Sequence, residues 1–309
     1  MTDTETGAAE EAAPTCYRHP GRETYVRCTR CDRPICPDCM NTASVGFQCP
    51  ECVREGNKTV RQARTVFGGR VGTDANVTKV LIGVTIVAFV GQLASSAFTA
   101  DYEMEGGAVA FYGEYYRMLT SAFLHAPSFP LHIAFNMYAL LAFGTQVERL
   151  LGGARYLVLY LVAALGGSVA TLLFLSPYTP SLGASGAVFG LFGAYFVMAR
   201  KLRADTSQLL LLIGFNLVIG IAGRAYINNW AHLGGLAAGA AVAFVYTQVP
   251  RGKNQAALQF AGAAAIAVLL AVTAFVRAND LCQNPPVVPP TRPDMAIPAA
   301  TCATGTPNL

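Results

Sequence analysis

The apolar positions of this chain are grouped into long, almost uninterrupted runs between residues 77 and 277. A helix needs about 20 predominantly apolar residues to cross the hydrocarbon core of a bilayer. The pattern predicts seven such stretches, and each should be helical because lipid offers no partner to an unpaired backbone group. They lie near 77–98, 131–151, 154–175, 184–201, 207–223, 230–249 and 256–277.

Composition agrees with this pattern. Of the 309 residues, 53% are hydrophobic and only 13% are charged, whereas an ordinary soluble domain carries roughly a quarter charged residues. Seven of the nine cysteines lie within residues 1–75. We therefore expect an all-α polytopic membrane protein with six core helices, a seventh C-terminal transmembrane helix and a small Cys-rich module ahead of them.

The chain divides by composition into six segments. They are an acidic disordered tail (1–14), the Cys-rich module (15–53), a basic linker (54–76), the six-helix core (77–249), the seventh helix (250–277) and a Pro-rich tail (278–309). The first segment is polar and has no apolar stretch, so it is not expected to be a signal or transit peptide. The first membrane helix would then direct insertion.

The positions of Lys and Arg predict the topology, because cytoplasmic flanks of membrane helices collect these residues. With a cytoplasmic N-terminus, the outer side carries only Arg117, Arg224, Arg277 and Arg292. The inner side carries Lys58, Arg61, Arg64, Arg70, Lys79, Arg149, Arg155, Arg200, Lys201, Arg203, Arg251 and Lys253. We expect an integral protein of a bacterial plasma membrane with its C-terminus outside. The net charge of +4 gives no indication of nucleic-acid binding.

The first outer loop, about residues 100–130, is too polar to span a bilayer and too apolar to be free in water. We expect it to lie in the membrane interface, where Tyr112, Tyr115 and Tyr116 are favoured. Cys282 and Cys302 fall in the outer tail, where a disulfide and two unpaired thiols both remain open.

The Cys-rich module contains four ligand pairs, each separated by two residues. They are Cys16 and His19, Cys28 and Cys31, Cys36 and Cys39, and Cys49 and Cys52. Eight such ligands suit two tetrahedral zinc ions, and a reducing cytoplasm disfavours disulfides. A module of this size with few large apolar side chains would fold only around its metals.

The module resembles a B-box-type zinc finger, in which ligand pairs interleave. By that resemblance Cys16, His19, Cys36 and Cys39 would hold one ion, and the other four cysteines the second; sequential pairing is the alternative. Because no ligand position is left open for water, we expect structural zinc and a docking or regulatory role toward a cytoplasmic protein partner.

Ionisable residues inside membrane helices are candidates for function. The fourth stretch begins with Ser185 between glycines, and the sixth places His232, Gly235 and Gly239 on one face. Glycines let two helices approach closely, and Gly186 and Gly190 repeat at the matching spacing on the fourth stretch. A neutral imidazole brought within reach would activate the serine hydroxyl as a nucleophile.

His132 and Asn136 are four residues apart on the second stretch and can both donate hydrogen bonds. Together with the backbone N–H of Ser185 they would stabilise an oxyanion. The structural alternative is an interhelical hydrogen-bond clamp that has no chemistry.

These motifs resemble the rhomboid family of intramembrane serine proteases over about residues 77–249. The resemblance rests on Gly183-x-Ser185-Gly186, Ala231-His232 followed by Gly235 and Gly239, and His132-x-x-x-Asn136. It implies a Ser185–His232 dyad without an acidic member, an oxyanion site at His132 and Asn136, and single-span membrane substrates. Tyr116-Arg117 and Glu148-Arg149 are similar to structural motifs of the family.

The chain differs from the family pattern in three places, one of which is that the seventh helix and the Cys-rich module lie outside the common six-helix core. Phe189 stands where many relatives have a tyrosine packed beneath the histidine, so the stacking surface remains without its hydroxyl. His125 is separated from His132 by an insert containing Pro127 and Pro130, and no role is assigned to it.

The function expected from this sequence is a serine endopeptidase that cleaves transmembrane helices near the outer face of the bilayer. One alternative is a catalytically inactive relative that binds membrane clients. A transporter or channel would require charged residues along the spans, which are absent from this sequence.

Overall fold

The computed structural model describes residues 13–59, 63–71, 75–223 and 227–287. The chain divides into two compact units, Met1–Gln62 and Ala63–Leu309. Most of the predicted acidic tail, most of the Pro-rich tail and Cys302 lie outside the described residues.

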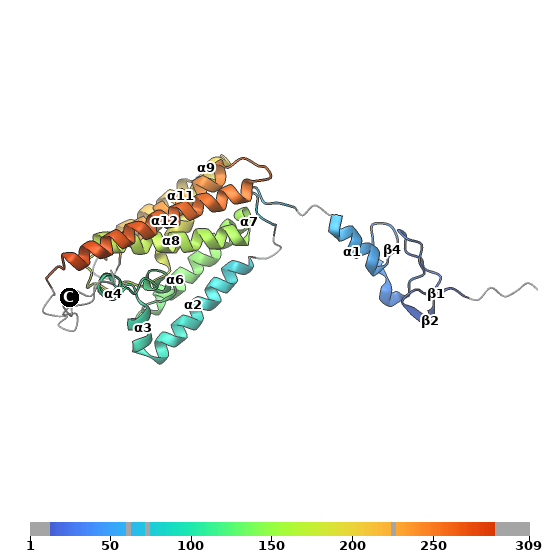
Figure 1. Cartoon of the computed structure of the whole chain (residues 1–309), viewed down its shortest axis with the longest axis horizontal. Coiled ribbons are helices and arrows are strands. Elements are labelled where there is room, and N and C mark those ends of the chain that lie inside the picture. The colour runs from blue at the N-terminus through green and yellow to red at the C-terminus, as the bar shows by residue number, and fades with distance from the viewer. Residues whose placement is uncertain (1–12, 60–62, 72–74, 224–226, 288–309) are drawn as a thin grey trace, which may run out of the picture. The chain divides into compact units, whose positions relative to one another are not determined.

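In residues 13–59, the described part of the N-terminal unit, the chain forms two short antiparallel hairpins, one 3₁₀ turn and one helix (Figure 1). Its elements are β1 (Thr15–Cys16), β2 (His19–Glu23), η1 (Pro37–Cys39), β3 (Asn41–Thr42), β4 (Phe47–Gln48) and α1 (Pro50–Thr59). The buried hydrophobic cluster of this unit is made of six cysteines and Ile35. So small an apolar core cannot offset the conformational entropy lost on folding, which agrees with a metal-dependent module.

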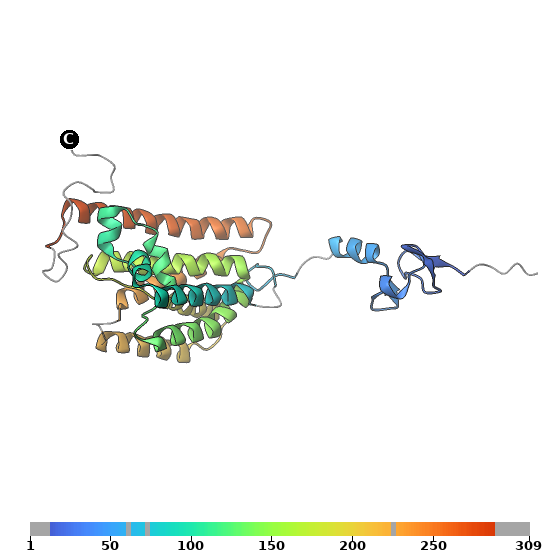
Figure 2. The same cartoon turned by 90° about the horizontal axis from the view of Figure 1, so that it is seen from below.

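The second unit is built from helices, as the apolar pattern predicts (Figures 1 and 2). Its elements are α2 (Asn76–Ala94), α3 (Ser96–Tyr102), α4 (Gly106–Tyr112), α5 (Arg117–Thr120), η2 (Ser121–Phe123), α6 (Pro130–Ala139), η3 (Leu140–Gly144), α7 (Thr145–Leu151), α8 (Gly153–Phe174), α9 (Ser185–Lys201), α10 (Ser207–Ala222), α11 (Asn229–Gln248) and α12 (Gln255–Gln283). Each of the seven predicted stretches is helical. The second is divided into α6, the π-helical η3 and α7.

Within the described residues, four helices are long and apolar enough to cross a membrane by length and composition, namely α2, α8, α11 and α12. The other predicted spans form shorter helices than the pattern suggested. Helix α9 has 17 residues and α10 has 16, because the chain turns into loops at both of their ends. Helix α12 instead continues to Gln283, six residues beyond the predicted span.

The predicted interfacial loop contains the short helices α3, α4 and α5. Arg117 is buried and donates hydrogen bonds to the backbone carbonyls of Ala100 and Glu103, which ties α5 to α3. Tyr112 and Tyr116 remain exposed on its surface. The motif Tyr116-Arg117 thus has a structural part in this loop.

Glu148 fixes the start of α2. Its buried carboxylate accepts hydrogen bonds from the backbone N–H groups of Val77 and Thr78, at 3.0 and 2.8 Å, and from the Thr78 hydroxyl at 2.8 Å. The first N–H groups of a helix have no partner within it, and a carboxylate also suits the positive end of the helix dipole. Glu148 therefore caps α2 from α7.

Helix α11 packs against both α8 and α9 (Figure 1). Glycines make these contacts unusually close. A Cβ at Gly235 would overlap the carbonyl oxygen of Gly186, and one at Gly239 would overlap the backbone of Gly190. A Cβ at Gly166 would lie 2.9 Å from the Gly234 carbonyl oxygen on the α8 side. The backbones of the three helices are therefore in direct contact.

Helix α12 is joined to the rest of the unit by a buried polar cluster. Gln259 donates to the carbonyl oxygens of Tyr246 at 2.8 Å and Phe67 at 3.1 Å, and accepts from Arg155 Nε at 2.7 Å. Buried polar groups are costly unless they are hydrogen-bonded, and here the amide uses both ends. Helix α12 and the segment 63–71 are thus held to α8 and α11.

We expect Gly239→Val to lower the free energy of unfolding by about 1–3 kcal/mol, since the new side chain would force α9 and α11 apart. Thermal unfolding in detergent micelles measures this. The matched control is Gly83→Val in α2, where a Cβ meets no described atom within 4 Å. An equal loss of unfolding free energy in both variants would show that the close contact of α9 and α11 does not determine the stability of this unit.

Candidate functional site

Ser185 is the first residue of α9 and is half-buried. The chain reaches it through Gly183, whose φ of +134° is a conformation that residues with side chains rarely adopt. Gly183 N–H donates to the Ser121 carbonyl oxygen at 2.9 Å, and Ser181 exchanges two backbone hydrogen bonds with Met104. The loop ahead of Ser185 is therefore held by the 95–129 region.

His232 lies in the first turn of α11, and its Nε2 is 2.9 Å from Ser185 Oγ. Its other nitrogen, Nδ1, is 3.2 Å from Asn229 Oδ1. The Asn229 amide is oriented by its NH₂, which donates to the Leu217 carbonyl oxygen at 3.0 Å. Its oxygen therefore faces His232, so Nδ1 carries the proton and Nε2 accepts from the serine hydroxyl.

The imidazole is also fixed by stacking. The ring of Phe189, one turn after Ser185 on α9, lies parallel to His232 with an interplanar angle of 2° and ring centroids 4.2 Å apart. The stacking surface expected from Phe189 is thus present. Both the ring plane and the tautomer of His232 are set by neighbours on two helices.

Asn228 joins the start of α11 to the loop before Ser185. Its Oδ1 caps the helix by accepting from Ala231 N–H at 3.2 Å. Its NH₂ donates to Ser181 Oγ at 3.0 Å and to Thr171 Oγ1 at 2.8 Å. The sequence analysis missed Asn228 and Asn229, although two asparagines directly before an apolar helix are an N-cap signal.

His132 faces the same space as Ser185. A Cβ built on Gly183 would be 2.9 Å from His132 Nε2 and 3.7 Å from Ser185 Oγ, so the missing side chain lets the His132 ring approach the loop beside Ser185. The other His132 nitrogen, Nδ1, accepts from Ala126 N–H at 3.4 Å. Nε2 must then carry the proton, which makes it a hydrogen-bond donor beside the serine.

Asn136 is buried one turn further along α6. Its NH₂ donates to the carbonyl oxygen of His132 at 2.9 Å. One amide hydrogen is used by this bond within α6, which leaves the second for another acceptor.

His125 is fully buried despite the insert that follows it. Its ring meets His132 edge to face at 4.9 Å, and its Nε2 accepts from Ala184 N–H at 3.5 Å. The backbone N–H of His125 donates to Gln92 Oε1 at 2.9 Å. His125 therefore supports both His132 and the residue before Ser185. The sequence feature that could have pointed to His125 is a histidine in an otherwise apolar loop.

The predicted supporting residues bring Ser185 and His232 together. A Cβ at Gly186 would lie 3.2 Å from the carbonyl oxygen of Ala231, and Gly235 touches Gly186 across the same interface. Because the two backbones touch here, directly beside Ser185, the short serine hydroxyl can reach an imidazole on the neighbouring helix. Such an arrangement can activate a nucleophile for acyl transfer.

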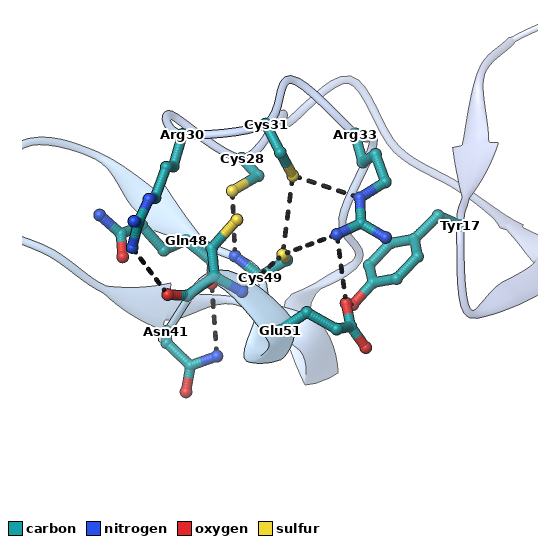
Figure 3. Close-up of polar contacts among 10 residues, drawn as sticks. Tyr17, Cys28, Arg30, Cys31, Arg33, Asn41, Gln48, Cys49 and Glu51 are labelled. Carbon is teal, nitrogen blue, oxygen red and sulfur yellow. Dashed lines mark hydrogen bonds and ion pairs between the residues drawn. The ribbon is translucent and has the colours of Figure 1, made fainter. Parts of the chain in front are cut away.

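The eight predicted metal ligands form two clusters in the N-terminal unit, and within each cluster all ligand atoms lie within 4.8 Å of one another. The first is Cys16, His19, Cys36 and Cys39, and the second is Cys28, Cys31, Cys49 and Cys52. The structure thus groups the pairs in the interleaved order. Figure 3 shows most of the second cluster.

Donor distances in both clusters suit a tetrahedral ion. Zinc–sulfur bonds of about 2.3 Å at tetrahedral angles separate two sulfurs by about 3.8 Å. Cys31 and Cys49 Sγ are 3.7 Å apart, and His19 Nδ1 lies 3.2, 3.5 and 3.8 Å from the sulfurs of Cys36, Cys39 and Cys16. These residues therefore fit two four-coordinate metal sites.

The fold and site define a polytopic helical membrane protein with a serine and a histidine hydrogen-bonded across two helices. Residues 112–249 match the family model described as Rhomboid domain. The chain is 33% identical over 141 residues to "Putative rhomboid protease YdcA" of Bacillus subtilis (strain 168), covering 44% of this chain and 69% of that relative. The protein belongs to the rhomboid family.

Other relatives match shorter shares of their own length. "Rhomboid protease GluP" of Bacillus subtilis (strain 168) is 45% identical over 132 residues, which are 41% of this chain and 25% of the relative. "RHOMBOID-like protein 6, mitochondrial" of Arabidopsis thaliana is 35% identical over 146 residues, 45% and 46% of the two chains. The chain thus spans between a quarter and half the length of these two relatives.

Replacing Cys28 and Cys31 together by serine should remove about one of two bound metal ions per chain, because only the second cluster loses ligands. Elemental analysis of the purified full chain measures this. Replacing Cys16 and Cys36 should have the same effect through the first cluster. Unchanged metal content in both double variants would contradict the two-site grouping.

Proposed function

We propose that this protein is an intramembrane serine endopeptidase with Ser185 as nucleophile and His232 as general base. The observation that carries the proposal is the 2.9 Å contact between His232 Nε2 and Ser185 Oγ, with the acceptor nitrogen facing the hydroxyl. Membership of the rhomboid family and two relatives named as rhomboid proteases support it.

In the proposed reaction, Ser185 Oγ attacks the carbonyl carbon of the scissile peptide bond while its proton passes to His232 Nε2. The negative charge forms on the former carbonyl oxygen. Three donors would stabilise it, namely the Ser185 backbone N–H, the His132 Nε2–H and the free amide hydrogen of Asn136. His232 then protonates the leaving amine, and a water molecule hydrolyses the acyl-enzyme with His232 again as base.

Substrates of this enzyme would be single-span membrane proteins, whose backbone must leave the helical state at the cleavage point to reach Ser185. Such a segment would have to reach the place beside Gly183 where Ser185 and His132 lie close together. We further propose that the protein lies in a bacterial plasma membrane with a cytoplasmic N-terminus and its C-terminus outside, with cleavage near the outer face.

For the N-terminal unit we propose a B-box-type zinc finger with two structural zinc ions. Cysteine and histidine ligands without an open position suit zinc that holds a fold and takes no part in catalysis. The ions would stabilise a unit whose core is otherwise mostly cysteine. The finger would dock a cytoplasmic protein partner, and nucleic acid is not expected to bind.

Ser185→Ala and His232→Ala should each abolish cleavage of a co-expressed single-span model substrate, because neither variant can form the acyl-enzyme. Fragments detected by immunoblot measure this, and labelling of the wild type by a fluorophosphonate should be lost in Ser185→Ala. If the wild type and both variants gave the same fragment, Ser185 and His232 would not carry the reaction. An uncleaved substrate that co-purifies equally with all three would instead indicate an inactive client-binding protein.

Phe189→Leu should lower kcat about 3- to 10-fold with little change in KM. The variant loses the flat surface that orients His232, and an aromatic pair contributes about 0.5–1.5 kcal/mol beyond its buried area. Phe189→Tyr keeps the stacking surface and should keep the activity. Phe192→Leu is the matched control, because Phe192 is buried on the same helix and contacts Phe143 edge to face and Phe189 at a tilt, but does not stack on His232. A larger loss in Phe192→Leu would contradict the orienting role.

A further inference from the structure

The two metal clusters of the N-terminal unit differ in charge. Four thiolates around a divalent ion leave two uncompensated negative charges, whereas three thiolates and a neutral imidazole leave one. The cluster of Cys28, Cys31, Cys49 and Cys52 is therefore the one that most needs nearby positive charge or N–H donors.

Arg33 supplies both to this cluster (Figure 3). Its Nε donates to Cys31 Sγ at 3.2 Å, and its terminal NH₂ donates to Cys49 Sγ at 3.7 Å. These two sulfurs come from different ligand pairs, 18 residues apart in the chain. A planar guanidinium can contact two acceptors in this way, whereas a lysine ammonium acts as a point charge.

The guanidinium is held in place by two further residues. It lies over the Tyr17 ring, with Cζ 4.5 Å from the ring centroid, and forms an ion pair with Glu51 at 3.6 Å. The Tyr17 hydroxyl also donates to the Glu51 carboxylate, so the three side chains form a closed set. Arg33 keeps 43% of its side chain exposed, and bracing of this kind limits the conformations of an otherwise free arginine.

The other cluster has a different surrounding. There the guanidinium of Arg22 is hydrogen-bonded to the Asp38 carboxylate. Arg22 also lies beside the sulfur of one ligand, Cys36, so each cluster has an arginine next to it. The arginine that bridges two sulfurs belongs to the four-cysteine cluster.

The positions of the bracing residues also connect the two clusters. Tyr17 directly follows Cys16, a ligand of the first cluster, and Glu51 lies between Cys49 and Cys52, ligands of the second. A change in the backbone at Cys16 would therefore move the surface on which Arg33 rests.

We propose that Arg33 is a positioning residue which stabilises the thiolates of the four-cysteine cluster and, through Tyr17 and Glu51, couples its metal affinity to occupancy of the other cluster. Partners of this kind around metal ligands change metal affinity by about 10- to 100-fold when they are removed. The inference rests on the proposed zinc sites.

The test uses the full chain in detergent micelles, stripped of metal and titrated with Co²⁺, whose absorption distinguishes a four-sulfur site from one with three sulfurs and a nitrogen. Arg33→Met should lower the affinity of the four-sulfur site about 10-fold and shift its sulfur-to-cobalt charge-transfer band to longer wavelength. The shift follows because N–H donors lower the energy of the sulfur electrons. Arg33→Lys should recover part of the affinity.

The coupling between the two metal sites is measured from the order in which Co²⁺ fills them. Tyr17→Leu keeps all eight ligands but removes the surface beneath Arg33, and should weaken the four-sulfur site in the same direction as Arg33→Met by a smaller factor. Arg27→Met is the matched control, because Arg27 directly precedes Cys28 but pairs with Asp32. In the wild type, filling of the three-sulfur site should strengthen the four-sulfur site, and this effect should disappear in Tyr17→Leu.

Unchanged affinity and band position in Arg33→Met would overturn the inference while leaving two zinc sites intact. An equal loss at both sites with no band shift would assign Arg33 a purely structural role and would also overturn it. Failure of the proposed zinc sites is a separate result, because the wild type itself would then bind fewer than two ions.

Discussion

The membrane unit depends on backbone contact between α11 and its two neighbours. Gly235 and Gly239 leave no side chain between α11 and α9, and Gly166 does the same on α8. Helices in lipid gain little from the hydrophobic effect on association, so close van der Waals packing must stabilise them instead. The same contact sets the distance between Ser185 and His232, since both lie in the first turns of the packed helices. The contact that packs the helices together is therefore also the contact that places Ser185 next to His232.

The remaining parts of the site are held by elements around this helix pair. Asn228 fixes the start of α11, His125 reaches the residue before Ser185, and Phe189 orients the imidazole. At the other end of the unit, Gln259 attaches α12 to backbone carbonyls of α11 and of the segment 63–71. Helix α12 lies outside the matched Rhomboid domain, yet it is bound by buried polar contacts rather than by apolar packing alone.

Much of this arrangement could be predicted from the sequence, because it rests on periodicity and composition. The helical stretches, the glycine faces and the approach of Ser185 to His232 follow from residues that repeat at helical spacing. The interleaving of the metal ligands was left open, since spacing within each pair is the same for both groupings. The contacts of His125 could not be predicted either, because the residues of the insert after it, 127–130, are exposed while the His125 ring is buried. The π-helical turn between α6 and α7 depends on tertiary geometry that no local pattern encodes.

The partner of His232 Nδ1 is an amide, where a soluble serine hydrolase would commonly have a carboxylate. An ionised carboxylate at this depth would have to be transferred from water into a medium of low dielectric constant, at a cost of several kcal/mol. A neutral asparagine avoids that cost, so the resting site carries no net charge and is compatible with the bilayer around it. The same substitution removes the anion that would stabilise an imidazolium during the reaction. In the proposed reaction, the imidazolium of His232 would therefore be stabilised by the dipole of the Asn229 amide and not by a full negative charge.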